Sequence, residues 1–248
     1  MTNQPLVSII MASFNSERTI LHAMESVLSQ TYPNIELIVI DGGSTDSTPQ
    51  IIELFEKKMQ GRMKWISERD NGMYDAMNQG LARSSGELIG ILNSDDWYES
   101  DAVETMMHEY QNNHTAVLYG ILRYVEDEKE TMLYRMHHDS LKDGMITHPT
   151  CFVPKALYSE FGSFDLGYRL SSDYELMLRF QSKGVQFIPV DKIIANFSHG
   201  GLSTINTDGL IEGFRIRNAY GHISSRQMQW GILKLRIKSI LKSVRINA

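Results

Sequence analysis

Two adjacent carboxylates, Asp95 and Asp96, are the side chains of this chain best suited to chemistry. They follow the apolar run 88–92, which predicts a strand buried on both faces of a parallel sheet. Open α/β sheets bind ligands outside the carboxyl ends of such strands. Neighbouring carboxylates repel each other unless a cation or a shared proton offsets their charge, and Mg²⁺ and Mn²⁺ prefer oxygen ligands. The pair therefore predicts a divalent-metal site; the alternative is that it caps a helix beginning near Ser100.

The elements that must position this pair alternate between strand and helix. The predicted strands span 6–12, 35–40, 63–66, 88–92 and 116–120, and the predicted helices about 20–28, 49–59, 73–82 and 101–110. This alternation favours a parallel, doubly wound sheet. Between 121 and 154 the apolar runs are short and interrupted by charge, which predicts mixed or antiparallel strands and loops. A capped helix is expected from about Ser171 and a further strand at 186–190.

The composition fits one substantial domain, or a domain plus a small appendage. Of 248 residues, 42% are hydrophobic, and the single cysteine, Cys151, excludes an intrachain disulfide. No apolar run is long enough to span a bilayer, and residues 1–5 lack the features of a signal peptide, so we expect a cytoplasmic location. No Gly-x-Gly-x-x-Gly or phosphate-loop motif is present, which argues against NAD binding. No motif or aromatic platform indicates nucleic acid binding.

Four short stretches stand out by their order and spacing: Ala12-Ser13-Phe14-Asn15, residues 39–46, residues 92–96, and Ser172-Asp173-Tyr174 with Leu178-Arg179. Together they resemble glycosyltransferase family 2. The resemblance implies the α/β GT-A fold: a Rossmann-like, mostly parallel central sheet flanked by helices, with a mixed acceptor-side half and C-terminal helices. It implies a nucleotide-sugar-binding half at 1–120, an acceptor-binding and catalytic half of the same domain at 121–205, and a helical basic tail at 206–248.

The resemblance also assigns the side chains that contact the nucleotide-sugar donor. The implied set is Ser13, Asn15, Glu17, Asp41, Arg69, Asp70, Asn78, Asn93, Asp95 and Asp96. Asp41 would contact the nucleoside, with a plain turn residue as the alternative, and Phe14 would either pack inside or form a wall against the base. Asn93 stands where the family usually has Asp, and Met77 where many relatives have Arg. Arg69 is therefore either a charge that neutralises the diphosphate or a solvated surface residue.

A divalent cation, Mn²⁺ or Mg²⁺, is implied as the cofactor. Asp95 would be its ligand, with Asp96 as a second contact and His199 completing the site, although a lone histidine is often structural or solvated. The cation would bridge the donor phosphates and stabilise the departing diphosphate. His148 resembles a position near the acceptor and diphosphate, and His137, with its neighbour in sequence, is expected on the surface.

Asp173 is the implied catalytic base. Inversion by a single displacement needs one carboxylate or histidine within hydrogen-bond reach of the acceptor hydroxyl. The family commonly has an acidic pair here, but this chain has Ser172 before Asp173. The alternative is that Ser171 and Asp173 only cap the helix. Glu175, in the same helical turn, is the substitute base if Asp173 faces away.

The expected function is an inverting, metal-dependent, non-processive transfer of a sugar from a nucleotide diphosphate sugar, with UDP as the expected nucleotide. The acceptor would be a hydroxyl of a glycan or a polyprenyl-linked molecule in bacterial surface polysaccharide synthesis. The Gln-x-x-Arg-Trp motif of processive relatives is missing. The alternatives are a catalytically silent nucleotide-sugar binder, favoured by Asn93, Met77 and Ser172, and a nucleotidyltransferase.

The last part of the chain is basic. From Arg226 onward it has six Lys and Arg residues and no acid, although the whole chain carries a net charge of −6. Apolar residues recur three or four positions apart at Leu233, Ile237, Ile240, Leu241 and Val244. This pattern predicts a basic amphipathic helix that contacts an anionic membrane surface as a peripheral anchor. The alternative is that the helix packs on the domain or on another subunit of a homo-oligomer.

Overall fold

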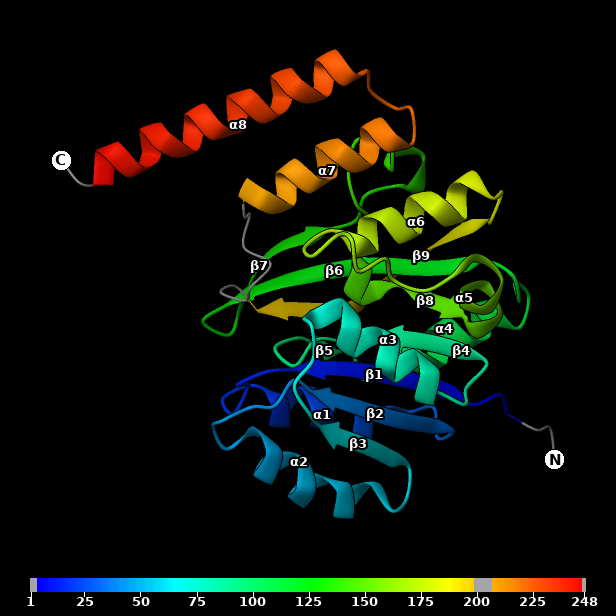
Figure 1. Cartoon of the computed structure of the whole chain (residues 1–248). Helices are drawn as coiled ribbons and strands as arrows, with labels where there is room; N and C mark the ends of the chain where they lie inside the picture. The colour runs from blue at the N-terminus through cyan, green and yellow to red at the C-terminus, as the bar shows by residue number, and fades with distance from the viewer. Residues whose placement is uncertain (1–3, 199–206, 247–248) are drawn as a thin grey trace.

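The computed structural model describes residues 4–198 and 207–246, with the side chains of the last helix described as far as residue 239. The described chain forms one sheet with helices on both faces (Figure 1). The strands are β1 Val7–Ser13, β2 Ile35–Asp41, β3 Met63–Ser67, β4 Leu88–Ile91, β5 Trp97–Tyr98, β6 Val117–Glu126, β7 Lys129–Tyr134, β8 Phe152–Pro154 and β9 Phe187–Ser198. The α-helices are α1 Ile20–Leu28, α2 Thr48–Glu56, α3 Met73–Arg83, α4 Ala102–Tyr110, α5 Lys155–Phe161, α6 Ser172–Ser182, α7 Thr207–Ala219 and α8 Ser225–Ile246. Short 3-10 helices are η1 Lys57–Met59, η2 His138–Ser140 and η3 His148–Thr150.

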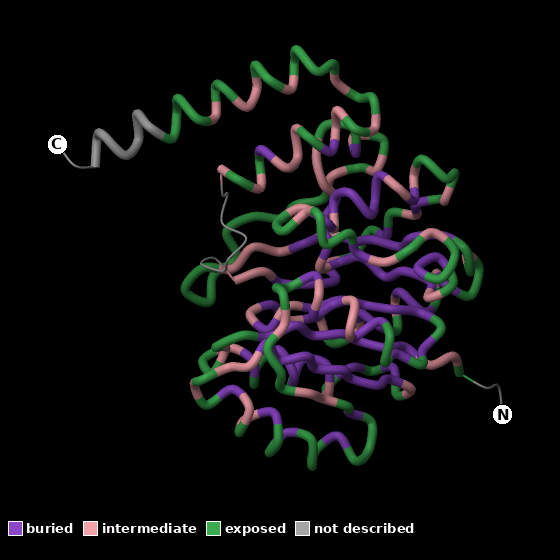
Figure 2. Tube along the Cα trace, in the orientation of Figure 1, coloured by how far each residue is buried: buried purple, intermediate pink, exposed green. Residues whose placement is uncertain are grey.

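The first half of the sheet is parallel, as predicted. Its strands lie in the order β3-β2-β1-β4, and every residue of β1, β2 and β4 is buried. Continuous apolar strands of this kind need cover on both faces. One apolar cluster joins them to α1, α2 and α4, and a second joins the opposite face to α3, α5 and α6. Figure 2 shows the resulting buried centre, with exposed residues on the outer turns of the helices.

The second half of the sheet is mixed, which confirms the prediction for residues 121–154. β8 is antiparallel to β4 and to β6, β7 forms an antiparallel hairpin with β6, and β9 is parallel to β6. β6 is longer than the predicted 116–120 and runs across the predicted division between 120 and 121. The two halves are therefore joined by one continuous sheet.

The C-terminal segment forms two helices, and α8 lies outside α7, away from the sheet (Figure 1). Their close approach depends on Gly231, because a Cβ there would lie 2.3 Å from the ring of Phe214. Within residues 4–198 and 207–246, no helix is both long and apolar enough to cross a membrane.

Candidate active site

Asp41 connects the loops that follow the first three strands. It ends β2 level with Ser13 on β1 and with Ser67 on β3. Its fully buried carboxylate accepts hydrogen bonds from the hydroxyls of Ser13 (3.0 Å), Ser44 (2.5 Å) and Ser67 (2.6 Å), and from the N–H of Ser44 (2.9 Å). These four donors match the four acceptor sites of a carboxylate. Asp41 therefore shapes the edge of the sheet, and its contact with a nucleoside stays a prediction that requires one of these donors to move.

The loop after β3 packs on the loop after β2. A Cβ on Gly42 would lie 2.8 Å from Oδ2 of Asp70, so only glycine leaves room for this carboxylate. Gly43 has a positive φ of 79°, a conformation that favours glycine. The contact brings Asp70 and the exposed Arg69 to the same edge of the sheet as Asp41.

Asn15 and Glu17 join the loop after β1 to the loop after β2. Oδ1 of Asn15 accepts the N–H of Thr45 (2.9 Å), and Oε2 of Glu17 accepts the N–H of Ser47 (2.9 Å). Phe14, beside them, is 58% exposed. The alternative that Phe14 packs inside is therefore wrong, because its ring lies on the rim of the loops.

The acidic pair lies at the same edge. Ser94, just before it, is 2.7 Å from Ser16 through their hydroxyl oxygens, which ties the loop after β4 to the loop after β1. Asp95 is half-buried and Asp96 is fully buried. Helix α4 begins at Ala102, with Asp101 as its N-cap residue and no side-chain cap. The alternative that the pair caps this helix is therefore wrong.

The environment of the pair fits a cation. Oδ2 of Asp96 accepts a hydrogen bond from Nδ2 of Asn93 (3.2 Å), whereas Oδ1 is buried and has no partner among the described residues. Burial raises the pKa of Asp95, and burial together with the charge of Asp95 raises the pKa of Asp96 well above its usual value. A buried acceptor without a donor is costly, and a hard divalent cation would satisfy it. The two acids are therefore suitable ligands for Mn²⁺ or Mg²⁺.

His199, the third predicted metal ligand, lies outside the described residues. The residue before it, Ser198, ends β9, and its backbone lowers the pKa of Asp96, opposing the effect of burial. The chain therefore reaches the acidic pair one residue before His199.

Asp173 lies in the first turn of α6 and is held by one of its two oxygens. Oδ1 accepts hydrogen bonds from the hydroxyl of Tyr74 (2.8 Å) and from the N–H of Tyr174 (2.8 Å). Oδ2 makes no hydrogen bond within the part of the chain that the structure describes. Ser171 is the N-cap residue, but its hydroxyl donates to the carbonyl of Gly209 instead of capping the helix. Asp173 thus has one oriented oxygen and one available oxygen.

Tyr74 links Asp173 to the donor side, because α3 follows the loop that carries Asp70. Its ring stacks on Phe164 with centroids 5.4 Å apart, and Phe164 also meets the edge of the His148 ring at 5.8 Å. Burial lowers the pKa of His148, while the charge of Asp173 opposes the shift. His148 therefore lies in the electrostatic field of the candidate base.

Asn78 holds the loop that contains Phe164. Its Oδ1 accepts the N–H of Phe164 (3.0 Å) and its Nδ2 donates to the carbonyl of the same residue (2.9 Å). The structure gives Asn78 this positioning role, and its predicted contact with the donor stays a prediction.

Glu175, the substitute base, is committed elsewhere. It forms a two-point ion pair with Arg179 (2.6 Å and 3.1 Å) and accepts the hydroxyl hydrogen of Tyr220 (2.6 Å). A carboxylate engaged by a guanidinium and a phenol is poorly placed to accept a substrate proton, so the geometry favours Asp173.

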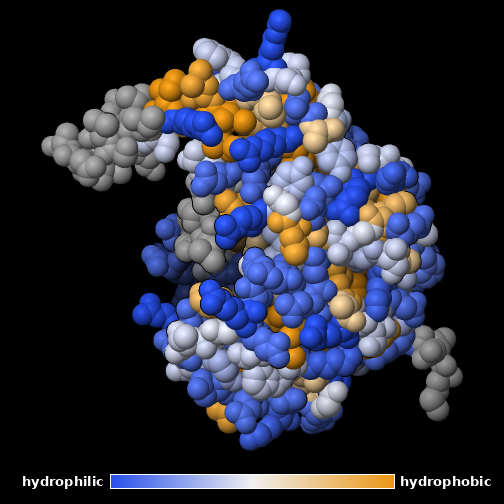
Figure 3. All heavy atoms as spheres, viewed as in Figure 1, coloured by the Kyte–Doolittle hydropathy of each residue, from blue (hydrophilic) through white to orange (hydrophobic). Residues whose placement is uncertain are grey.

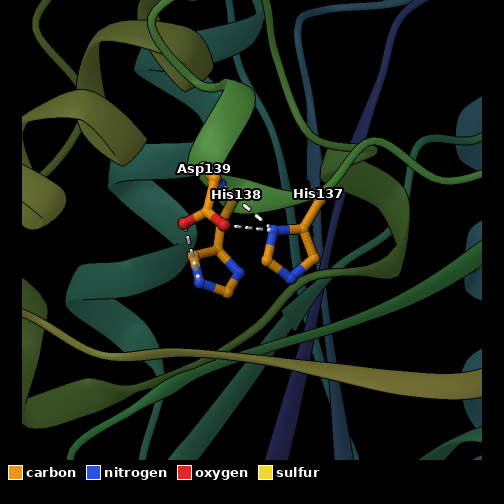
Figure 4. A group of neighbouring side chains, drawn as sticks. All are labelled: His137, His138 and Asp139. Atoms are coloured by element: carbon orange, nitrogen blue, oxygen red, sulfur yellow. Dashed lines mark hydrogen bonds and ion pairs between the residues drawn. The ribbon is translucent and has the colours of Figure 1, made fainter.

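A second group of possible metal ligands lies after β7. Among the described residues, one group offers at least three His, Cys, Asp or Glu ligand atoms that all lie within 4.8 Å of one another. It consists of His137, His138 and Asp139 (Figure 4). His137 and Asp139 are exposed and pair at 3.1 Å. Nδ1 of His138 lies 2.9 Å from the hydroxyl of Tyr119, so the surface expectation holds for His137 but not for its partly buried neighbour.

Comparison with known proteins decides the family. Residues 8–168 match the model of glycosyl transferase family 2. The chain belongs to glycosyl transferase family 2. The uncharacterized glycosyltransferase Rv1514c of Mycobacterium tuberculosis (strain ATCC 25618 / H37Rv) is 32% identical over 186 residues, which are 72% of this chain and 70% of that protein. The putative glycosyltransferase EpsH of Bacillus subtilis (strain 168) is 35% identical over 128 residues, which are 52% of this chain but only 37% of EpsH.

Solved structures confirm the GT-A fold class that the resemblance implied. TarS 1–349 of S. aureus, in complex with UDP-GlcNAc, superposes with a TM-score of 0.72 at 17% identity, covering 93% of this chain and 71% of that one. The mannosyltransferase PcManGT of Pyrobaculum calidifontis, in complex with GDP-Man and Mn²⁺, gives a TM-score of 0.68 at 16% identity, covering 98% and 76%. The family match and the curated relatives confirm the expectation of a glycosyltransferase at the level of the family.

Two residues of this candidate site, Ser67 and Tyr74, were not predicted from the sequence. Tyr74 is 99 positions from Asp173, and Ser67 is 26 positions from Asp41. Ser67 carried a usable signal, because a polar residue directly after a predicted strand belongs at the same edge as the acids. Tyr74 carried none, since an aromatic residue near a helix start is usual in a core.

Proposed function

We propose that this protein is an inverting, metal-dependent, non-processive glycosyltransferase that uses a nucleotide diphosphate sugar. The observation that carries the proposal is the buried acidic pair at the carboxyl edge of the parallel strands, with Oδ1 of Asp96 lacking any partner among the described residues. Such a pair suits a divalent cation and the diphosphate that the cation would bind.

The donor would lie across the loops after β1, β2 and β4. The exposed Phe14 offers a wall for a planar base, and the polar rim of Asn15 and Glu17 lies beside it. We propose a UDP-sugar, which is consistent with the UDP-GlcNAc bound by the structural relative TarS. Arg69 is exposed at the same edge and would offset diphosphate charge that Met77, an apolar residue, does not.

Asp95 and Asp96, with His199, would hold the metal. When bound, the cation supplies Lewis-acid stabilisation of the departing diphosphate. Mn²⁺ accompanies GDP-Man in the mannosyltransferase relative.

Asp173 would act as the base. Its Oδ2 accepts the proton of the acceptor hydroxyl while the hydroxyl oxygen attacks the anomeric carbon of the sugar. The bond from that carbon to the phosphate oxygen breaks on the opposite face, and the nucleoside diphosphate leaves with the electron pair. Tyr74 and the N–H of Tyr174 keep Oδ1 in place, so that Oδ2 faces the acceptor.

The acceptor would be a glycan or a polyprenyl-linked molecule at a membrane surface. Trp230, Leu233 and Ile237 of α8 are 46–59% exposed, and Lys234 lies 5.2 Å from the Trp230 ring. In Figure 3 apolar and strongly hydrophilic side chains lie side by side over α7 and α8. Helix α8 packs on α7, yet these apolar side chains stay about half exposed, and we propose that they contact a membrane; another subunit is the alternative.

The test is binding of UDP with and without Mn²⁺. In the wild-type protein we expect Mn²⁺ to tighten UDP binding, measured by calorimetry, and a panel of UDP-, GDP- and dTDP-sugars to show slow donor hydrolysis. Asp95→Ala should abolish the effect of Mn²⁺, because it removes the expected ligand. Asp191→Ala, at an exposed acid on β9, is the control and should behave as wild type. Equal UDP binding by both variants with Mn²⁺ would contradict the metal site.

A further inference from the structure

A pocket is lined by Tyr74, the residue that donates a hydrogen bond to the candidate base, Asp173. It has a volume of about 440 Å³ and lies between the start of α3, the segment before α6, and the helices α7 and α8. A molecule in this pocket would therefore contact the residue that orients the candidate base.

Arginines from three separate segments line the pocket. They are Arg169 in the loop before α6, Arg215 on α7 and Arg236 on α8. The structure gives none of the three guanidinium groups a hydrogen bond or ion pair within residues 4–198 and 207–246. Three guanidinium groups without such partners, brought together from distant parts of the chain, are suited to an anion.

Three acids also line the pocket, Asp75, Asp208 and Glu212, and the first and last of these accept hydrogen bonds from backbone and amide groups. Asp75 accepts hydrogen bonds from the N–H (2.9 Å) and the side-chain amide (3.1 Å) of Asn71. Glu212 accepts the N–H groups of Arg169 (3.0 Å) and Leu170 (2.9 Å). Glu212 thus fixes the backbone of the segment that carries Arg169, while the guanidinium group stays available.

We propose that this pocket binds a phosphate or diphosphate group carried by the acceptor, and that Arg169, Arg215 and Arg236 thereby position the acceptor hydroxyl beside Asp173. Planar guanidinium groups match phosphate oxygens in two-point hydrogen bonds. The inference rests on the proposed function, because it assigns the pocket to the acceptor of that reaction. The phosphate can belong to a lipid headgroup or to a phosphorylated glycan, since the arginines recognise what the two share.

The experiment measures the affinity of four probes at fixed ionic strength: inorganic phosphate, hexyl phosphate, glucose 6-phosphate and UDP. The variants are Arg169→Gln, Arg215→Gln and Arg236→Gln. Each should weaken binding of at least one phosphate ester about tenfold, the range expected for losing one charge-assisted hydrogen bond. Binding of UDP with Mn²⁺ should stay within twofold of wild type. Arg62→Gln is the matched control, an exposed arginine outside the pocket, and urea unfolding midpoints verify that each variant is folded.

The arms of the experiment separate the sources. If the wild-type protein binds hexyl phosphate more tightly than glucose 6-phosphate, the proposal is supported with a lipid-borne phosphate. If it binds glucose 6-phosphate more tightly than hexyl phosphate, the proposal is supported with a phosphorylated glycan. If Arg215→Gln weakened the binding of UDP as much as the binding of the phosphate esters, the proposal would be overturned, because the arginines would then bind the donor. Unchanged ester binding in all three variants would also overturn it. Failure of the proposed function is a separate result, seen as loss of Mn²⁺-dependent UDP binding in the wild type.

Discussion

At the scale of single residues, the distinction between the two oxygens of Asp173 is the most informative feature of the site. Oδ1 accepts two hydrogen bonds of 2.8 Å, one from Tyr74 and one from the helix backbone, and so sets the orientation of the carboxylate. A base that is held at one oxygen keeps the other in a fixed direction, which lowers the cost of aligning it with a substrate hydroxyl.

Asp173→Asn should keep donor binding and lose sugar transfer. The amide oxygen can still accept both hydrogen bonds at Oδ1, so we expect normal folding, but the amide nitrogen cannot take a proton. The rate of transfer should fall about 10²–10⁴-fold, the usual contribution of general-base catalysis. Product formation from radiolabelled donor and the Kd for UDP measure the two properties. Asp127→Asn, in the exposed turn after β6, is the control, and retained transfer in Asp173→Asn would remove Asp173 as the base.

At the scale of elements, α6 is fastened to its surroundings by Glu175 and Arg179. Arg179 pairs with Glu175 and donates to the carbonyls of Phe161 (2.8 Å) and Ser163 (2.8 Å), while Tyr220, just after α7, donates to Glu175. One network thus holds α6, the end of α5 and the end of α7 together. The position of Asp173 at the start of α6 depends on it.

Glu175→Ala should lower the free energy of unfolding by about 3 kcal/mol, since removing one partner of a largely buried ion pair leaves the other charge without compensation. Urea denaturation followed by circular dichroism measures it. The matched control is Glu25→Ala, which breaks the half-exposed pair with Lys58 (3.5 Å) and should cost less than about 1 kcal/mol. Similar losses in the two variants would show that the network does not stabilise α6.

At the scale of the whole molecule, α8 lies outside α7 and is largely exposed. It packs on α7 through Gly231 and Phe214, and it leaves three large apolar side chains exposed next to basic ones. Because Arg236 of the same helix lines the pocket near Asp173, a membrane bound by α8 would lie close to the proposed acceptor site.

Leu233→Glu with Ile237→Glu should reduce binding to vesicles that contain anionic lipid. The substitutions remove apolar area from the interface and bring negative charge to it, and each basic residue near such a surface contributes about 1 kcal/mol. Flotation with anionic vesicles measures binding, and uncharged vesicles are the comparison. Leu54→Glu, at an exposed leucine on α2, controls for the added charge. Equal flotation of wild type and variant would favour another subunit as the partner of α8.

Along the first half of the chain, continuous apolar runs alternate with segments whose apolar residues have helical spacing. This pattern was enough to predict the parallel half of the sheet, because strands buried on both faces must be continuously apolar. It also placed Asp41 and Asp95 at strand ends, which is why the sheet edge could be predicted. Residues 121–154 gave weaker signals, since β7 is exposed along its whole length and β8 has three residues. The extension of β6 beyond residue 120 and the two-residue β5 were missed for the same reason, because pairing with distant strands, and not local pattern, forms them.

Contacts between distant residues were decided only by the tertiary structure. The sequence shows that Asp41 is polar and ends a strand, but not that four donors surround it. It shows Asp173 and Glu175 in one helical turn, but not that Arg179 and Tyr220 engage Glu175 while Tyr74 orients Asp173. Composition shows a basic tail, but not that Arg236 meets Arg169 and Arg215 at one pocket. The physical reason is that periodicity reports which face of an element is buried, whereas hydrogen bonds and charge pairs depend on which elements the fold brings together.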